Sequence, residues 1–100
     1  MTDHVTVADQ GNGVRLVVID RPQKKNALTG AMYDAMRVAL EEADASPAIR
    51  ALVFAGQPGM FSAGNDLSDF LARSGAGFSE TPALRFIRQL ARTEDRKSVV

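Results

Sequence analysis

The sequence predicts an α/β fold. Strand-like segments rich in β-branched residues alternate with helical patterns of apolar residues along the 100-residue chain. Residues 49–55 are almost continuously apolar, which is typical of a strand covered on both faces of its sheet. Hydrophobic residues make up 45% of the chain, as in a globular protein, and the length suits one small domain or part of a larger one.

The first two strands are expected to form a hairpin. Residues 4–8 and 14–20 have strand patterns, and residues 11–13 between them, Gly-Asn-Gly, supply turn chemistry that tolerates a positive φ. Arg21 and Pro22 should end the second strand, because proline cannot donate to a ladder and biases its predecessor away from helix.

A helix is expected to run from Thr29, its N-cap, to about Ala45, where Ser46 and Pro47 close it. Its apolar residues recur at helical spacing and should form one buried face. These residues are Met32, Ala35, Met36, Ala39, Leu40 and Ala43.

After the apolar strand at 49–55 we expect a glycine-bearing loop at 56–66, a short helix at 67–72 and a loop at 74–80. Thr81 and Pro82 suit the N-cap and first residue of another helix. The inner stripe of this helix is expected to be Leu84, Ile87, Leu90 and Ala91. A further strand starts near Ser98, and we expect residues 1–100 to be the N-terminal part of a longer single domain, cut at this strand.

Composition excludes several classes of function. The 12 basic and 12 acidic residues cancel, so no basic excess indicates binding to nucleic acid or to an anionic membrane. The chain has no cysteine and its one histidine is His4, so a thiolate site, a catalytic triad or a His-rich metal site is not expected. No apolar run is long enough to span a bilayer and no signal peptide is evident, which predicts a cytoplasmic protein.

Residues 61–67, Phe-Ser-Ala-Gly-Asn-Asp-Leu, form the strongest candidate for a functional loop. A run of small residues between a strand and a helix leaves backbone N–H groups unshielded, and such groups can bind an anion or a polarised carbonyl oxygen. A simpler alternative is that Gly64 permits a turn and Asp66 caps the helix that starts at Leu67. The residues alone favour this simpler alternative.

A second candidate segment, residues 21–28, joins the hairpin to the first helix. Lys24 and Lys25 could contact phosphates as point charges, or they could belong to a solvated loop. Asn26 can satisfy backbone groups of this loop through its short side chain. Asp66 is the only acid within either candidate segment, so no pair of carboxylates indicates general acid–base chemistry here.

In order and spacing these segments resemble the N-terminal portion of the crotonase superfamily, the enoyl-CoA hydratase/isomerase family. The similarity extends over residues 14–22, the triplet Asn26-Ala27-Leu28, the first helix, residues 50–56 and residues 61–66, which together span nearly all of the chain. The resemblance implies a spiral of ββα units, followed by a helical C-terminal region, in homotrimers or hexamers.

The resemblance also implies that the substrate and partner is an acyl-CoA thioester, with no separate cofactor because CoA is part of the substrate. The thioester oxygen would lie in an oxyanion hole of two backbone N–H groups, one of them from Asn65. The second N–H and the catalytic acids would lie beyond residue 100. The residues that would bind the substrate are Lys24, Lys25, Ala27, Ala63, Gly64, Asp66 and Leu67.

Two reactions follow from the resemblance, namely hydration of a 2-enoyl-CoA and movement of a double bond from position 3 to position 2. The sequence Gly-Asn-Asp-Leu at 64–67 is more similar to the peroxisomal-type isomerases than to typical hydratases. Alternatives are another reaction of the superfamily, such as dehalogenation, decarboxylation or ring cleavage, or a non-catalytic fragment that binds acyl-CoA or oligomerises. The 100-residue chain alone is expected to be inactive, because catalysis needs the missing groups.

Overall fold

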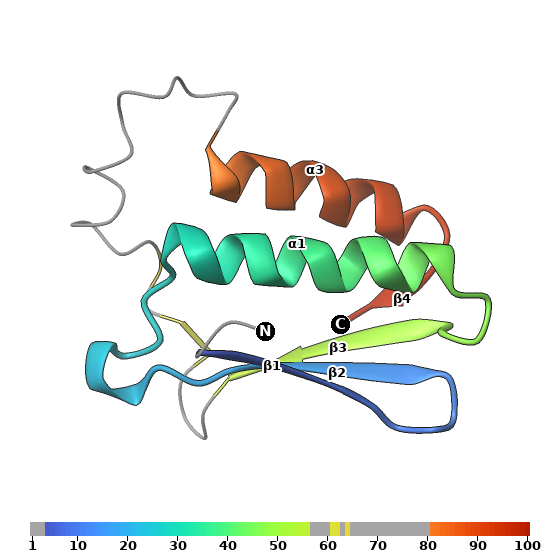
Figure 1. Ribbon diagram of the computed structural model, residues 1–100, viewed down its shortest axis with the longest axis horizontal. Helices are drawn as coiled ribbons and strands as arrows, with labels where there is room; N and C mark the ends of the chain where they lie inside the picture. Colours follow the sequence, from blue (N-terminus) through green and yellow to red (C-terminus); the bar gives the residue numbers. More distant parts are fainter. Residues whose placement is uncertain (1–3, 57–60, 63, 65–80) are drawn as a thin grey trace.

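The computed structural model describes residues 4–56, 61, 62, 64 and 81–100, which form a helix layer packed on a sheet (Figure 1). This arrangement confirms the α/β class. The short helix expected at 67–72 and the loop expected at 74–80 lie outside the described residues. The elements in chain order are β1 (Val5–Asp9), β2 (Val14–Ile19), the 3₁₀ helix η1 (Pro22–Lys24), α1 (Gly30–Ala45), β3 (Ala51–Ala55), α3 (Pro82–Glu94) and β4 (Ser98–Val99).

The four strands lie in the sheet in the order β1-β2-β3-β4. The predicted hairpin is confirmed, because β1 and β2 pair antiparallel with Val7 opposite Val17. β3 joins β2 in parallel and β4 joins β3 in parallel, so the strand expected near Ser98 is confirmed as well. Gly13, with a φ of 87°, ends the hairpin turn, and its carbonyl accepts hydrogen bonds from the N–H groups of Arg50 and Ala51 at 2.7 and 3.1 Å.

Helix α1 begins and ends where the sequence predicts. Thr29 is the N-cap, and its hydroxyl accepts a hydrogen bond of 3.2 Å from the N–H of Met32. The buried face of α1 packs on the sheet and divides between two core clusters. Cluster one contains Val5, Val17, Ile19, Met32, Met36 and Ala39, and cluster two contains Leu40, Ala43, Ile49 and Leu52.

Helix α3 lies beside α1 (Figure 1), but its inner face differs from the predicted stripe. Leu90 packs against cluster two as predicted, but Ile87 is 54% exposed and Ala91 is exposed too. Gln89 and Thr93 are buried instead. The reason is a polar contact that the apolar pattern could not predict, because the side chains of Gln89 and Thr93 donate to Oδ2 of Asp44 on α1 at 2.7 and 3.0 Å. Helix α3 is therefore rotated so that these two polar residues face α1.

Strand β3 is covered on one face only within the part of the chain that the structure describes. Leu52 is fully buried and Phe54 packs against both clusters, on the side where α1 and α3 lie (Figure 1). Val53, which points to the opposite face in a strand, stays partly exposed. Both described helices lie on the same side of the sheet, so the expectation of a strand covered on both faces stays a prediction for the other face.

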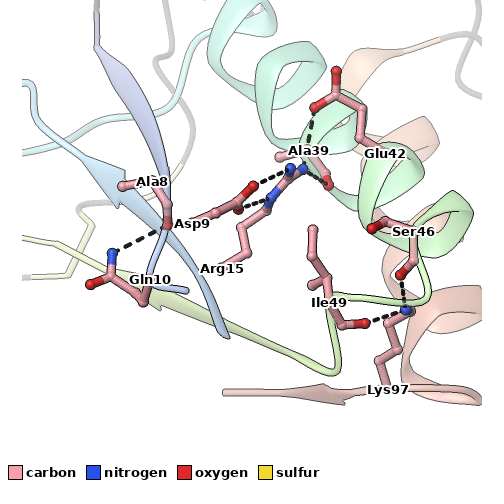
Figure 2. A network of polar contacts seen from close by, with 9 residues as sticks. All are labelled: Ala8, Asp9, Gln10, Arg15, Ala39, Glu42, Ser46, Ile49 and Lys97. Atoms are coloured by element: carbon pink, nitrogen blue, oxygen red, sulfur yellow. Dashed lines mark hydrogen bonds and ion pairs between the residues drawn. The ribbon is translucent and has the colours of Figure 1, made fainter. Parts of the chain in front are cut away.

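Two long cationic side chains join the layers (Figure 2). The guanidinium of Arg15 on β2 donates to both carboxylate oxygens of Asp9 at 2.7 and 3.1 Å, and it also reaches the carbonyl of Ala39 on α1 at 2.9 Å. The ammonium of Lys97 donates to the carbonyls of Ser46 and Ile49 in the turn between α1 and β3. Arg15 therefore donates to one backbone carbonyl outside the strand ladder and Lys97 to two.

Candidate functional site

The two candidate segments follow neighbouring parallel strands. Residues 21–28 follow β2, and residues 61–64 follow β3, which pairs with β2 so that Val18 lies opposite Ala55. The carboxyl ends of parallel strands meet at the same edge of a sheet, and this edge is where ligands bind in open α/β sheets. The topology thus brings both segments to the edge at which a binding site is expected.

Asn26 joins the two segments. Its side chain is fully buried, and its backbone has a φ of 57°, in the left-handed region that asparagine tolerates better than most residues. The side-chain carbonyl accepts a hydrogen bond of 2.6 Å from the N–H of Arg21, while the side-chain amide donates to the carbonyls of Ile19 at 3.2 Å and Phe61 at 3.0 Å. The expected role of Asn26 in satisfying loop backbone is confirmed and extends to the second segment.

Ser62 continues the connection toward Gly64. The hydroxyl of Ser62 donates to the carbonyl of Asn26 at 2.8 Å, and the N–H of Gly64 donates to the same hydroxyl oxygen at 3.0 Å. The carbonyl of Gly64 in turn accepts a hydrogen bond of 2.7 Å from the N–H of Leu28. A ring of hydrogen bonds therefore holds residues 26–28 against Phe61, Ser62 and Gly64.

Gly64 is suited to its position by its conformation. Its φ is 98°, which L side chains rarely adopt, whereas a Cβ at this position would meet nothing within 4 Å. The requirement for glycine is therefore backbone strain and not lack of space. The backbone here can be approached closely, as a site that binds through N–H groups requires.

Lys24 and Lys25 lie in the segment that follows β2, at the carboxyl edge of the sheet. Lys24 ends η1 and Lys25 follows it with a φ of 53°, and both side chains are exposed. Ala27 is half-buried beside them, and its carbonyl accepts a hydrogen bond of 3.0 Å from the guanidinium of Arg21. The sequence did not predict η1, a single turn that Pro22 favours by fixing its own φ.

Of the predicted site residues, the structure describes Lys24, Lys25 and Ala27 in the segment after β2, and Gly64 in the segment after β3 that is hydrogen-bonded to it at Leu28. The other predicted residues, Ala63, Asn65, Asp66 and Leu67, lie outside the described residues. Sequence reasoning missed the role of Ser62. A usable signal was present, because serine hydroxyls bond backbone groups two residues along the chain, and Gly64 stands at that separation.

The carboxyl group of Asp9 and the phenol of Tyr33 have shifted pKa values. The hydrogen bonds from Arg15 lower the pKa of Asp9, and burial, with the ring of Phe86 nearby, raises the pKa of Tyr33. Among the described residues, no group of three or more His, Asp or Glu side chains could hold a metal ion. No helix in the described ranges has the length and apolar content needed to cross a membrane.

An open hollow of 820 Å³ lies at the other edge of the sheet, where β3 and β4 begin. Ile49, Arg50, Arg96 and Lys97 contribute to its lining. We do not assign the candidate site to this hollow, because in parallel sheets ligands bind at the carboxyl ends of the strands. The candidate site is therefore assigned to the two hydrogen-bonded loops at the carboxyl edge, although the hollow at the other edge is large.

Comparison with known proteins gives one consistent result. Residues 9–100 match the family model described as enoyl-CoA hydratase/isomerase. The chain is 37% identical over 71 residues to enoyl-CoA delta isomerase 2 of Rattus norvegicus, covering 71% of this chain and 18% of that protein. It is 32% identical over 66 residues to hydroxycinnamoyl-CoA hydratase-lyase of Pseudomonas fluorescens, covering 66% of this chain and 24% of that protein.

Solved structures agree with the sequence relatives. The structure of OdaA from Pseudomonas aeruginosa superposes with a TM-score of 0.87 at 36% identity, over 98% of this chain and 38% of that chain. The chain therefore has the fold of a part of that longer protein. The chain spans 18% of the rat relative and 24% of the Pseudomonas fluorescens relative.

Proposed function

The chain belongs to the enoyl-CoA hydratase/isomerase family, and from this premise we propose that it is the N-terminal part of an acyl-CoA-processing enzyme. In this proposal the enzyme stabilises the enolate of a thioester in an oxyanion hole made of backbone N–H groups. The observation that supports it most is the ring of hydrogen bonds through Asn26, Ser62 and Gly64. The ring sets a strained glycine backbone at the carboxyl edge of parallel strands.

In the proposed mechanism the N–H of Asn65 is one of two donors to the thioester oxygen. Negative charge develops on this oxygen when a proton leaves C2 or when water adds at C3. A fixed N–H strengthens its hydrogen bond as the charge grows, and losing one such donor typically costs about 3 kcal/mol of transition-state stabilisation. The side chain of Asn65 would take no part, since the donor is main chain.

The CoA portion of the substrate would bind along the same edge. Lys24 and Lys25 are exposed and can follow flexible phosphates as point charges, and Ala27 lies beside them. We keep Ala63, Gly64, Asp66 and Leu67 as further substrate-binding residues. No separate cofactor is proposed, because the activated group is the thioester of CoA itself.

The reaction is proposed to be hydration of a 2-enoyl-CoA or conversion of a 3-enoyl-CoA into its 2-enoyl isomer. Hydration adds water across the double bond, and isomerisation moves a proton from C2 to C4 through the enolate. The catalytic acids and the second oxyanion donor would lie beyond residue 100. The proposal further includes a trimeric or hexameric assembly in the cytoplasm.

A spectrophotometric assay of the full-length enzyme that carries this chain tests the proposal. We expect turnover of a 2-enoyl-CoA or a 3-enoyl-CoA, and no turnover by the 100-residue chain alone. Failure of the full-length enzyme with both substrates would remove both reactions. Calorimetry with acetyl-CoA then separates the alternatives, because binding without turnover favours a non-catalytic acyl-CoA-binding role.

A further inference from the structure

We propose that Asn26 and Ser62 are positioning residues that set the direction of the backbone N–H following Gly64. This inference rests on the proposed function, since it names what orients the donor of the oxyanion hole. Neither side chain would touch the substrate. Both would act through backbone groups to which they are hydrogen-bonded, those of Phe61 for Asn26 and of Gly64 for Ser62.

The side chain of Asn26 has a fixed orientation. Its amide nitrogen donates to two carbonyls, those of Ile19 and Phe61, and its oxygen accepts from the N–H of Arg21. Rotating the amide by half a turn would place its oxygen against two carbonyl oxygens and its nitrogen against an N–H group. The end of β2 and the second loop are therefore held by one rigid group that is fully buried.

The hydroxyl of Ser62 passes this constraint to Gly64. The carbonyl of Asn26 can only accept and the N–H of Gly64 can only donate, so the hydroxyl must donate to the first and accept from the second. The N–H of Leu28 holds the carbonyl of the same glycine at 2.7 Å. Gly64 is thus fixed on both sides of its Cα atom.

The carbonyl of Gly64 belongs to the peptide unit that contains the next N–H. A trans peptide unit is planar, and its N–H points opposite to its C=O. A hydrogen bond that fixes the carbonyl of Gly64 therefore also favours one direction for the following N–H. This relation connects Asn26 and Ser62 to the proposed oxyanion donor without any contact between them and the substrate.

The positioning role of Ser62 can be tested without disturbing the hydrophobic core. Ser62 contributes to neither core cluster, and its hydroxyl is the only group that Ser62→Ala removes. Ser62→Thr keeps a hydroxyl at the same position. Ser98→Ala removes an exposed hydroxyl from β4, at the opposite edge of the sheet, and serves as the matched control.

Hydrogen exchange on the full-length enzyme that carries this chain tests the ring itself. In Ser62→Ala the amides of Gly64 and Leu28 should exchange roughly fivefold to tenfold faster, because one hydrogen bond contributes about 1 kcal/mol. The amides of Met36 and Leu40 in α1 should not change, and Ser98→Ala should match the wild type. Unchanged exchange at Gly64 would overturn the inference.

Steady-state kinetics of the full-length enzyme test the catalytic role. Ser62→Ala and Asn26→Asp should lower kcat roughly tenfold to a hundredfold while KM changes less than about twofold, because the loss falls on the transition state. Asn26→Asp keeps the shape of the side chain but cannot donate when ionised, so its kcat should recover partly at lower pH. Ser62→Thr should restore most of the activity.

The outcomes separate this inference from the proposed function. An active wild type with unchanged kcat in Ser62→Ala and Asn26→Asp contradicts the inference alone. A wild type that turns over no acyl-CoA contradicts the proposed function, and the positioning role falls with it even if the exchange of Gly64 responds. A rise in KM at constant kcat would also contradict the inference, because it would indicate a contact with bound substrate.

Discussion

Arg15 lies within a strand and yet leaves only 8% of its surface exposed. Its guanidinium is satisfied by Asp9 on the neighbouring strand, by Glu42 and by the carbonyl of Ala39 on α1 (Figure 2). The planar guanidinium suits this geometry because it presents several donors in a fixed fork, which an ammonium group cannot match. Arg15 therefore connects the hairpin to the helix where an apolar residue would be expected.

We expect the pair of Asp9 and Arg15 to stabilise the fold above about pH 4 and to lose effect in acid. The hydrogen bonds from Arg15 lower the pKa of Asp9 below its ordinary value of 3.8. A carboxyl group whose folded pKa is depressed stabilises the folded state above its unfolded pKa, and this contribution is lost as the pH falls toward the folded value. Asp9→Asn should lower the urea midpoint at neutral pH.

Urea titrations at roughly pH 7 and roughly pH 2.5 measure this effect. The midpoints of Asp9→Asn and wild type should converge at the lower pH. The exposed Asp20 gives the matched control, Asp20→Asn. A difference between Asp9→Asn and wild type that persists unchanged in acid would show that the ion pair does not carry the stability.

At the scale of the element, α1 illustrates how far local sequence specifies structure. Thr29 caps the helix as its position predicts, and the apolar spacing places Met32 and Met36 on the buried face. Helix α3 has the predicted N-cap at Thr81, but its inner face is only partly as predicted, since Leu90 packs on the core and Ile87 does not. The difference is that capping depends on neighbours in the chain, whereas the rotation of α3 depends on Asp44, far away in sequence.

Removing the cap of α1 should destabilise the chain measurably. Thr29→Ala leaves the N–H of Met32 without its side-chain acceptor, and such losses typically cost about 1 kcal/mol. Thr29→Ser keeps the hydroxyl and should stay close to the wild type. Urea unfolding followed by circular dichroism provides the measurement, and equal stability of Thr29→Ala and Thr29→Ser would contradict the assignment of the cap.

The same reasoning explains which parts of the candidate site could be predicted. The positive φ angles of the two loops could be predicted from the residue types. Few residues other than glycine tolerate the φ of 98° at Gly64, and asparagine tolerates the φ of 57° at Asn26 better than most. The bond from Asn26 to the carbonyl of Phe61 spans 35 residues and depends on the parallel pairing of two strands. Such a contact follows from the sheet topology and not from any local pattern.

At the scale of the whole described fold, Phe86 of α3, like Phe54 of β3, joins the two core clusters. It packs against both of them, and its ring centroid lies 5.8 Å from Tyr33 of α1 and 6.1 Å from Phe54 of β3. Aromatic pairs at such distances add to the free energy gained by burying their surface. Helix α3 therefore completes the core of the described part instead of covering it loosely.

We expect Phe86→Ala to destabilise the whole chain by about 2 to 3 kcal/mol, less than for a fully buried ring. Ile87→Ala changes the neighbouring residue, which is 54% exposed, and should shift stability by less than about 0.5 kcal/mol. Thermal unfolding of both variants measures the difference. A larger loss of stability in Ile87→Ala than in Phe86→Ala would contradict this expectation and would favour an inner face that contains Ile87.

The spatial order of the strands, β1-β2-β3-β4, is also their order in the chain. Each new strand is added to the outer edge of the strand made before it, so none has to insert between two that are already paired. The hairpin is local and can form in microseconds, whereas the parallel pairing of β2 with β3 must wait until α1 has been made. The sheet can therefore assemble in the direction of synthesis on the ribosome, with each strand serving as the template for the next.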